Sequence, residues 1–206
     1  MIETLKKIGI VPVVKINRAE TAVGLAKALS RAGLPAAEIT FRTDAAEEAI
    51  RLIAKEVPEV FVCAGTVLNV ENAEKAVKAG AKAIISPGTN LEVVRWCQSH
   101  SVPVIPGCAT PTEVEACMRE GLRLVKLFPA EVVGGVKMLK ALAGPYASMT
   151  FMPTGGISVK NVQEYLALKN VAACGGSWIV PEALLDGERF DEIEALAREA
   201  AALAHP

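Results

Sequence analysis

The stretch Arg123-Leu124-Val125-Lys126-Leu127-Phe128-Pro129-Ala130-Glu131 places one lysine inside an otherwise apolar run. An apolar run of this length that ends at a turn-forming proline is typical of a buried strand. Apolar residues fall on both faces of the run, as in parallel strands that helices cover. The sequence therefore predicts a parallel α/β fold in which Lys126 lies near the C-terminal end of an inner strand.

The position of Lys126 supports two interpretations. Burial disfavours the charged form of an amine, and a neutral amine held in a strand can attack a carbonyl and form an imine. In the alternative, the aliphatic part of the side chain packs while the amine reaches water, as most lysines do. A lysine this close to the end of a buried strand fits the alternative poorly. The motifs in the rest of the chain are needed to choose between the two interpretations.

Outward from this strand, short apolar runs alternate with amphipathic segments along the chain. The predicted strands are residues 11–16, 36–41, 60–64, 83–86, 102–106, 122–128, 150–154 and 171–174. The predicted helices are residues 19–32, 44–57, 70–79, 91–99, 111–120, 136–142, 158–168 and 190–204, with Asp44 and Ser158 as caps of two of them. Such alternation argues for a parallel sheet, and eight strand–helix units argue for a (β/α)8 TIM barrel.

Length and composition predict a single domain over residues 1–206, because no linker or composition shift marks a second one. An open doubly wound sheet is the main alternative to the barrel. Hydrophobic residues make up 51% of the chain, which excludes a disordered protein. The formal net charge of −1 and the lack of long like-charged runs argue against a nucleic-acid partner or a membrane-binding surface.

The features that report on compartment predict a cytoplasmic protein. Residues 1–7 contain no apolar signal-peptide segment, and no apolar run reaches the length of a transmembrane helix. The 5 cysteines are odd in number and well separated, so we expect buried free thiols in a reducing compartment. No cluster of metal ligands is present, because Cys97-x-x-His100 is a single pair on a helix that we interpret as structural. Neither histidine lies at a predicted strand end, so we expect no metal and no Ser/His/Asp arrangement.

The second predicted strand carries polar residues on one face only. Glu38, Thr40 and Arg42 alternate there with Ile39 and Phe41. Because the apolar pair must face the surrounding helices, the polar residues should point into the barrel mouth, where barrel enzymes hold their chemistry. The alternative is an edge strand with its polar face in water, which a closed barrel does not offer.

The second and sixth strands should bring Glu38 and Lys126 together. Interior layers of a barrel take their side chains from alternate strands, and both of these strands are even-numbered. A carboxylate beside an amine in a dry barrel mouth is either an acid–base pair or a structural ion pair. Spacing alone leaves both interpretations open.

Paired glycines stand at the ends of the last two predicted strands. They are Gly155-Gly156 and Gly175-Gly176, and Ser177 follows the second pair. Backbone N–H groups that no Cβ atom obstructs can converge on an anion, and this end of a barrel is the common place for a phosphate. Two ordinary tight turns are the alternative, since such turns also use glycine.

These strand ends, taken together, resemble one family closely. The segments are Ala37-Glu38-Ile39-Thr40-Phe41-Arg42-Thr43, Gly65-Thr66-Val67-Leu68-Asn69, Ser86-Pro87-Gly88, Lys126-Leu127-Phe128-Pro129-Ala130-Glu131, Pro153-Thr154-Gly155-Gly156-Ile157 and Gly175-Gly176-Ser177-Trp178. They look like the signatures of the 2-keto-3-deoxy-6-phosphogluconate aldolases, class I enzymes that also handle 4-hydroxy-2-oxoglutarate. The resemblance implies a homotrimeric barrel enzyme of the Entner–Doudoroff pathway that acts on a small-molecule substrate without a metal or cofactor.

By the same resemblance, Lys126 takes the position of the Schiff-base lysine and Glu38 that of the acid–base carboxylate. Arg42 and Thr66 take the carboxylate-binding positions, and Pro87 and Phe128 look like walls around the pyruvyl group. Thr154 is a further substrate-binding position, and the phosphate-binding positions are Gly155, Gly156, Gly176 and Ser177. Lys15, at the end of the first strand, has no assigned role.

The reaction implied is reversible cleavage through an imine on Lys126, which acts as an electron sink while the C3–C4 bond breaks. The phosphorylated substrate would give pyruvate and glyceraldehyde 3-phosphate, and 4-hydroxy-2-oxoglutarate would give pyruvate and glyoxylate. Three alternatives stay open. They are an aldolase for the galactonate epimer, a phosphate-binding barrel isomerase or epimerase that uses Glu38 for proton transfer, and a non-catalytic barrel that binds a sugar phosphate.

Overall fold

The strands form two parallel sheets that curl around a common interior. In the computed structural model, which describes residues 1–204, one sheet has the order β5-β4-β3-β2-β1-β9 and the other the order β6-β7-β8. The strands are β1 Ile10–Val14, β2 Ala36–Thr40, β3 Phe61–Gly65, β4 Ile84–Ile85, β5 Val104–Ile105, β6 Gly107–Cys108, β7 Leu124–Leu127, β8 Thr150–Pro153 and β9 Cys174–Gly176. All the ladders between these strands are parallel.

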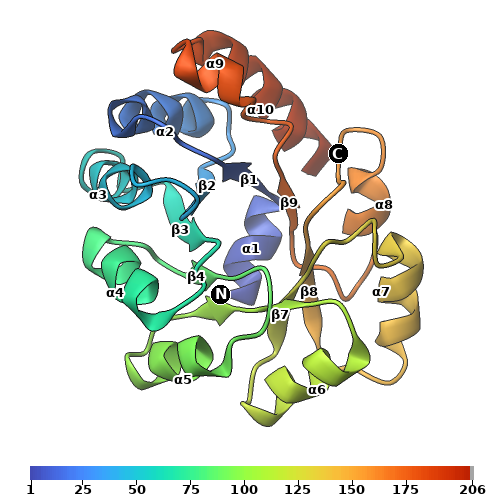
Figure 1. The fold of residues 1–206 in the computed structure, drawn as a ribbon. Helices are drawn as coiled ribbons and strands as arrows, with labels where there is room; N and C mark the ends of the chain where they lie inside the picture. The colour runs from blue at the N-terminus through green and yellow to red at the C-terminus, as the bar shows by residue number, and fades with distance from the viewer. Residues whose placement is uncertain (205–206) are drawn as a thin grey trace.

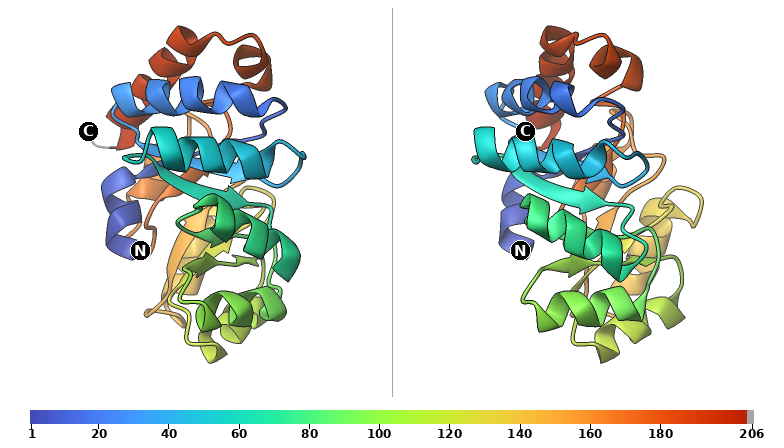
Figure 2. Two further views of the ribbon diagram at one scale, coloured as in Figure 1. Left: turned by 90° about the vertical axis from the view of Figure 1, so that its left-hand side faces the viewer. Right: turned by 60° about the vertical axis from the view of Figure 1, so that its left-hand side comes forward.

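Helices surround the sheets on the outside (Figure 1). They are η1 Ala19–Thr21, α2 Ala22–Arg31, α3 Ala46–Glu56, α4 Val70–Ala79, α5 Leu91–Ser99, α6 Pro111–Arg119, α7 Gly135–Ala143, α8 Val162–Leu166, α9 Glu182–Asp186 and α10 Phe190–Ala204. One further helix, α1 (Ile2–Ile8), lies at one end of the sheets instead (Figure 2). In the described part of the chain, none of the helices combines the length and hydropathy that crossing a bilayer requires.

Alternation along the strands separates two apolar clusters. The outer cluster lies between strands and helices and includes Ile39, Val125 and Phe151. The inner cluster lies inside the curl and draws on the opposite strand faces: Leu5, Val11, Ala36, Cys63, Ala83, Ile85, Ile105, Leu124, Met152, Ala172 and Ala173. The predicted division of the second strand is therefore confirmed for Ile39, which packs against the helices.

The ladders are interrupted at two places, so they do not show the single eight-stranded barrel that the sequence predicts. The predicted strand 102–106 is observed as β5, Val104–Ile105, and after Pro106 a separate short strand, β6, continues beyond the predicted end, since proline has no N–H to donate to a ladder. Between β8 and β9 only the isolated bridges Phe151↔Val171 and Thr154↔Gly175 are present. The predicted parallel α/β fold is confirmed, and its observed form is a curled half-barrel of six strands beside a three-stranded sheet.

Most predicted elements lie where the sequence places them, and the differences occur at their ends. β9 begins at Cys174, where the predicted strand 171–174 ends. The predicted cap at Asp44 is wrong, because the N-cap of α3 is Ala45, which forms no side-chain hydrogen bond. The predicted cap at Ser158 is also wrong, because α8 begins only at Val162. Instead, the Ser158 N–H donates to Asn161 Oδ1 at 2.9 Å, so a local turn shapes this loop.

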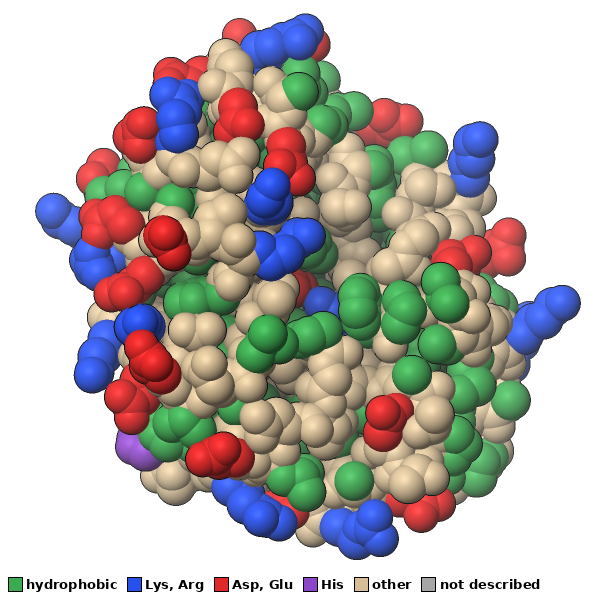
Figure 3. Space-filling view, in the orientation of Figure 1, with side chains coloured by type: hydrophobic (Ala, Val, Ile, Leu, Met, Phe, Trp, Pro, Cys, Tyr) green, Lys and Arg blue, Asp and Glu red, His purple; other side chains and the backbone are tan. Residues whose placement is uncertain are grey.

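Helix α1 closes the end of the curl at which the strands begin. Its Leu5 is fully buried in the inner cluster, and Ile2 and Ile8 pack against the same cluster. The sequence pattern does not predict α1 or α9, because helices this short show no clear apolar periodicity. The opposite end, where the strands finish, has a hollow at its centre that basic and apolar side chains border (Figure 3).

We expect Leu5→Ala to destabilise the fold by about 2–5 kcal/mol, because it removes a fully buried side chain and leaves a cavity under the inner cluster. Ile2→Ala is the matched control on the same helix, since Ile2 is only partly buried and should lose less. Urea unfolding followed by circular dichroism measures both variants. A Leu5→Ala midpoint equal to that of the wild type would show that α1 does not seal the interior.

Candidate active site

A buried ion pair joins β7 to β2 inside the curl. Lys126 Nζ lies 3.0 Å from Glu38 Oε1, and the two side chains are 6% and 1% exposed. The residues are 88 positions apart in the chain, and only the curl of the sheets brings them together. The contact between these two side chains is the one that strand alternation predicts. Two charges so far removed from water are tolerated only because each neutralises the other.

Gly65, the last residue of β3, makes room for the Glu38 carboxylate. A Cβ atom built on Gly65 would lie 2.3 Å from Glu38 Oε1, so a larger residue would displace the carboxylate from Lys126. The β2–β3 ladder also sets Cys63 opposite Glu38. Burial, and then the charge of Glu38, raise the pKa of the Cys63 thiol. A thiol whose pKa is raised in this way is a poor nucleophile.

Phe128 and Pro87 lie around the strand segment that carries Lys126. The centre of the Phe128 ring is 5.4 Å from Lys126 Nζ, within the range of a cation–π contact. Pro87 approaches from the loop after β4, and a Cβ atom on Gly107 would lie 2.0 Å from its carbonyl oxygen. Gly107 is in turn paired with Lys126 in the β6–β7 ladder. Phe128 thus lies close to the amine, and Pro87 packs against β6, the strand next to the one that carries Lys126.

Two predicted site residues have buried polar atoms without a protein partner. Within residues 1–204, the buried side-chain nitrogen and oxygen atoms that lack a hydrogen bond are Glu38 Oε2, Thr154 Oγ1 and Trp178 Nε1. Thr154 follows β8 on the face of the inner-cluster residue Met152, which pairs with Lys126 in the ladder. Because buried polar groups ordinarily have partners, these two oxygens mark positions where a bound molecule would supply hydrogen bonds.

The two glycine pairs lie side by side at the ends of β8 and β9. The isolated bridge between Thr154 and Gly175 brings the two turns together. Gly155 and Gly156 have φ angles of 101° and 80°, a backbone region that favours glycine. Ser177 is exposed directly after the second pair. The structure thus brings the predicted phosphate-binding residues close together: Gly155 and Gly156 in the turn after β8, Gly176 at the end of β9 and Ser177 directly after it.

Trp178 has a role in this region that the sequence pattern does not reveal. A Cβ atom on Gly176 would lie 2.0 Å from the Trp178 ring, so the ring lies directly against the backbone of β9. The only available signal is the aromatic residue two positions after a glycine, which is too common to interpret alone. The sequence also does not reveal that Gly65 makes room for Glu38, because glycine is common in tight turns after strands.

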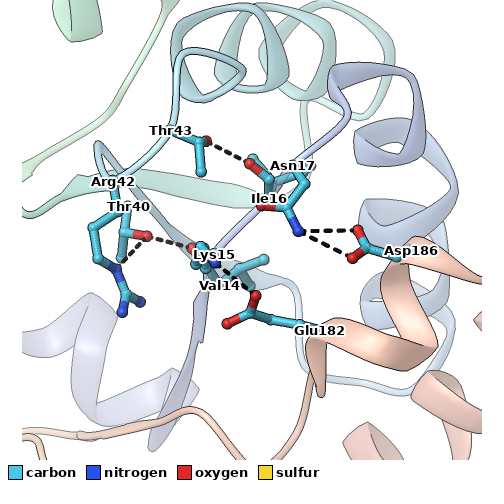
Figure 4. Close-up of polar contacts among 9 residues, drawn as sticks. All are labelled: Val14, Lys15, Ile16, Asn17, Thr40, Arg42, Thr43, Glu182 and Asp186. Carbon is cyan, nitrogen blue, oxygen red and sulfur yellow. Dashed lines mark hydrogen bonds and ion pairs between the residues drawn. The ribbon is translucent and has the colours of Figure 1, made fainter.

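The remaining predicted residues lie at the rim of the curl. Arg42 is exposed just beyond β2, and its Nε donates a hydrogen bond to Thr40 Oγ1 at 3.1 Å. Thr66 has a φ angle of 55°, a strained conformation for a β-branched residue and one that clusters at functional sites. Lys15 pairs with Glu182 at 2.8 Å (Figure 4). Helix α9 therefore adds a carboxylate to the rim that the sequence does not predict.

Arg42 also borders a cavity of about 300 Å³ that is separate from the buried pair. The loop after β2 lines this cavity together with Asn72 and Lys75 of α4. Neither Lys126 nor Glu38 contributes to it. The chemistry favours the interior over this cavity, because only the interior holds the amine, the carboxylate and the unpartnered oxygens.

Known proteins are similar to this chain in sequence and in fold. A family model described as KDPG and KHG aldolase matches residues 1–196. The 2-dehydro-3-deoxy-phosphogluconate aldolase of Dickeya dadantii is 50% identical over 193 residues, which cover 94% of this chain and 91% of that protein.

Two solved structures are also similar. A KDPG aldolase from Legionella pneumophila, with pyruvate captured as a covalent carbinolamine, has a TM-score of 0.92 at 38% identity and covers 96% of this chain and 97% of its own. The 2-keto-3-deoxy-6-phosphogluconate aldolase of Zymomonas mobilis with 3-phosphoglycerate has a TM-score of 0.91 at 36% identity, with coverages of 98% and 95%. The family match over residues 1–196 and the relative at 50% identity show that this chain belongs to the KDPG and KHG aldolase family.

Proposed function

We propose that this protein is a class I aldolase that reversibly cleaves 2-keto-3-deoxy-6-phosphogluconate to pyruvate and glyceraldehyde 3-phosphate, and 4-hydroxy-2-oxoglutarate to pyruvate and glyoxylate. The buried pair of Lys126 and Glu38, 3.0 Å apart, carries the proposal. An amine that is kept from water beside a proton acceptor is what imine formation with a 2-oxo acid requires. The carbinolamine captured in the Legionella relative supports the same chemistry here.

Lys126 acts first, as the nucleophile. Glu38 Oε1 accepts a hydrogen bond from the amine and is placed to take up its proton, which leaves the amine neutral. The amine then attacks the C2 ketone of the substrate to give a carbinolamine. Glu38 returns its proton to the carbinolamine hydroxyl, which leaves as water, so that a protonated imine forms and the Glu38 carboxylate is restored. The burial of Lys126 limits the access of bulk water to this intermediate.

Glu38 acts next, as the base. It takes the proton of the C4 hydroxyl, the C3–C4 bond breaks, and the electron pair passes into the imine to give an enamine while the aldehyde leaves. Protonation of the enamine at C3 and addition of water to the imine release pyruvate and restore Lys126. The unpartnered Glu38 Oε2 supports this role, because it leaves one oxygen for the substrate hydroxyl while Oε1 faces the amine.

The other site residues bind and orient the substrate. Arg42 suits the substrate carboxylate, because its guanidinium can bind both oxygens at once. Thr66 and Thr154 each offer a hydroxyl, and the Thr154 oxygen is already buried without a partner. Phe128 and Pro87 surround the pyruvyl group with apolar surface, and the Phe128 ring, 5.4 Å from Lys126 Nζ, also stabilises the positive charge of the protonated imine.

The glycine turns bind the phosphate. Gly155, Gly156 and Gly176 present backbone N–H groups without a Cβ atom in the way, and Ser177 adds an exposed hydroxyl. Such turns at the ends of the last two strands are a recurrent phosphate site in barrels. The 3-phosphoglycerate in the Zymomonas relative supports a phosphorylated ligand for this end of the site.

We also propose that the chain forms one closed eight-stranded barrel domain over residues 1–206 and assembles as a cytoplasmic homotrimer. Two observations support closure. The Lys126 N–H donates to the Pro106 carbonyl at 2.8 Å, which joins β7 to the strand that Pro106 interrupts, and two bridges join β8 to β9. Contacts between subunits would cover the exposed Leu68, Val132 and Val159, which are 55%, 83% and 40% exposed. The free cysteines support a reducing compartment.

Borohydride reduction in the presence of pyruvate should add one pyruvate-derived group to the peptide that contains Lys126, because reduction traps the imine. Lys126→Ala should abolish the label, and EDTA should leave wild-type activity intact. Lys15→Ala is the matched control and should keep the label, since Lys15 is paired with the partly exposed Glu182. Peptide mapping by mass spectrometry locates the group. A label on Lys15 would contradict the assignment, and an unlabelled wild type would favour an isomerase, an epimerase or a sugar-phosphate binder.

Ser177→Ala should raise KM for the phosphorylated substrate and leave cleavage of 4-hydroxy-2-oxoglutarate nearly unchanged, because only the first substrate carries a phosphate. Steady-state kinetics on both substrates measure the difference. The same assay with the gluconate and galactonate epimers establishes which C4 configuration the site prefers. Equal losses on the two substrates would show that Ser177 does not contact phosphate.

Glu38→Gln should lower the turnover rate by about 10²–10⁴-fold, because it keeps the size of the side chain but removes the base. Prolonged incubation with pyruvate and borohydride should still label Lys126, which separates the loss of the base from the loss of the nucleophile. Thermal melts control for folding, since removing one partner of a buried pair is destabilising. Turnover at the wild-type rate would make Glu38 a structural partner of Lys126.

A further inference from the structure

Two hydroxyl groups extend the contact between β1 and β2 beyond their ladder. The ladder pairs Val13 with Glu38 and Val14 with Ile39. Past that point, Thr40 Oγ1 donates a hydrogen bond to the Val14 carbonyl at 2.9 Å. A second threonine repeats the arrangement in the loop that follows β2, where the Thr43 hydroxyl donates to the Ile16 carbonyl (Figure 4).

The Thr40 hydroxyl has a further partner that Thr43 lacks. Arg42 Nε donates a hydrogen bond to Thr40 Oγ1 at 3.1 Å. The polarity of both bonds is unambiguous, because a carbonyl oxygen only accepts and a guanidinium N–H only donates. The single Thr40 hydroxyl hydrogen therefore points to the Val14 carbonyl, and its oxygen lone pair faces Arg42. Thr40 is 1% exposed, so water does not compete for either bond.

This contact leaves the far edge of the Arg42 guanidinium available. Only Nε is engaged by Thr40, and Arg42 pairs with no carboxylate among residues 1–204. The two terminal nitrogens form the fork that binds a carboxylate bidentately. Anchoring Nε restricts rotation of the planar group, so the fork is held in one orientation before a ligand arrives.

We propose that Thr40 is a positioning residue, whose buried hydroxyl orients the Arg42 guanidinium toward the carboxylate of the 2-oxo acid substrate. The proposal rests on the function proposed above, in which Arg42 binds that carboxylate. Thr40 thus ties the carboxylate-binding residue to the backbone of β1, so that the substrate is held in register with the amine that attacks it. A purely structural role would need only the bond to the Val14 carbonyl.

The test compares Thr40→Val with Thr43→Val. Each substitution is nearly isosteric and removes one hydroxyl that donates to a carbonyl of the β1 segment, but only Thr40→Val also removes the contact to Arg42. The readout is the pyruvate concentration that gives half-maximal labelling of Lys126 by borohydride. We expect Thr40→Val to raise it by about three- to tenfold, the range of one hydrogen bond, with the maximal labelling rate little changed.

Three further variants sharpen the test. Thr40→Ser keeps the hydroxyl, so its pyruvate concentration for half-maximal labelling should stay near the wild-type value. The same is expected for Thr43→Val. Arg42→Ala should raise it further, and the double variant Thr40→Val/Arg42→Ala should match Arg42→Ala alone, because Thr40 acts only through Arg42. If Thr40→Val does not fold, Thr40→Cys keeps the volume with a weaker acceptor and should give a smaller shift in the same direction.

The outcomes separate this proposal from the one on which it rests. A wild-type protein that pyruvate and borohydride never label overturns the aldolase function itself. A labelled wild type with unchanged half-saturation in Thr40→Val and Thr40→Cys overturns only the role of Thr40. Equal shifts in Thr40→Val and Thr43→Val, or additive effects of Thr40→Val and Arg42→Ala, would also overturn it, because they indicate a general loosening of the strand ends.

Discussion

The structure depends on keeping one ion pair out of water. Lys126 and Glu38 are almost fully buried, and their charges compensate each other at 3.0 Å. Removing one partner of such a pair costs about 3–5 kcal/mol, because the other is left as an unpaired buried charge. The strands that carry the pair are therefore held to one arrangement, in which β2 and β7 face each other across the interior. Gly65 completes it by leaving the space that the carboxylate occupies.

The two ends of the curled sheets differ in the polarity of their inner side chains. At the end where strands begin, Leu5 of α1 packs into the inner apolar cluster. At the end where strands finish, the same inner faces carry Glu38, Lys126 and Thr154. Glu38 Oε2 and Thr154 Oγ1 are buried there without a hydrogen-bond partner, so the described residues do not satisfy all the buried polar groups at this end.

Hydrogen bonds and ion pairs set the orientation of the side chains at the rim. The hydroxyl of Thr40 links Arg42 to the backbone of β1, and Glu182 links α9 to Lys15. The ion pair between Lys15 and Glu182 adds little to stability, since exposed ion pairs contribute about 0–1 kcal/mol. The importance of these contacts is that they orient charged groups around the interior that holds Lys126 and Glu38. The Legionella relative has the same fold at 38% identity, which fits a site that depends on a few well-placed side chains.

The sequence by itself determined the parallel α/β class, most strands and helices, the outward packing of Ile39 and the inward direction of Glu38 and Lys126. These properties follow from side-chain periodicity, which the local backbone geometry of a strand or helix dictates. Only the tertiary structure decided the 3.0 Å contact between residues 88 positions apart, the space beside Gly65, the two hydrogen bonds of Thr40 and the interruption of the barrel ladder at Pro106. Each of these depends on how closely packed segments that are distant in the chain approach one another, and no local pattern encodes that distance.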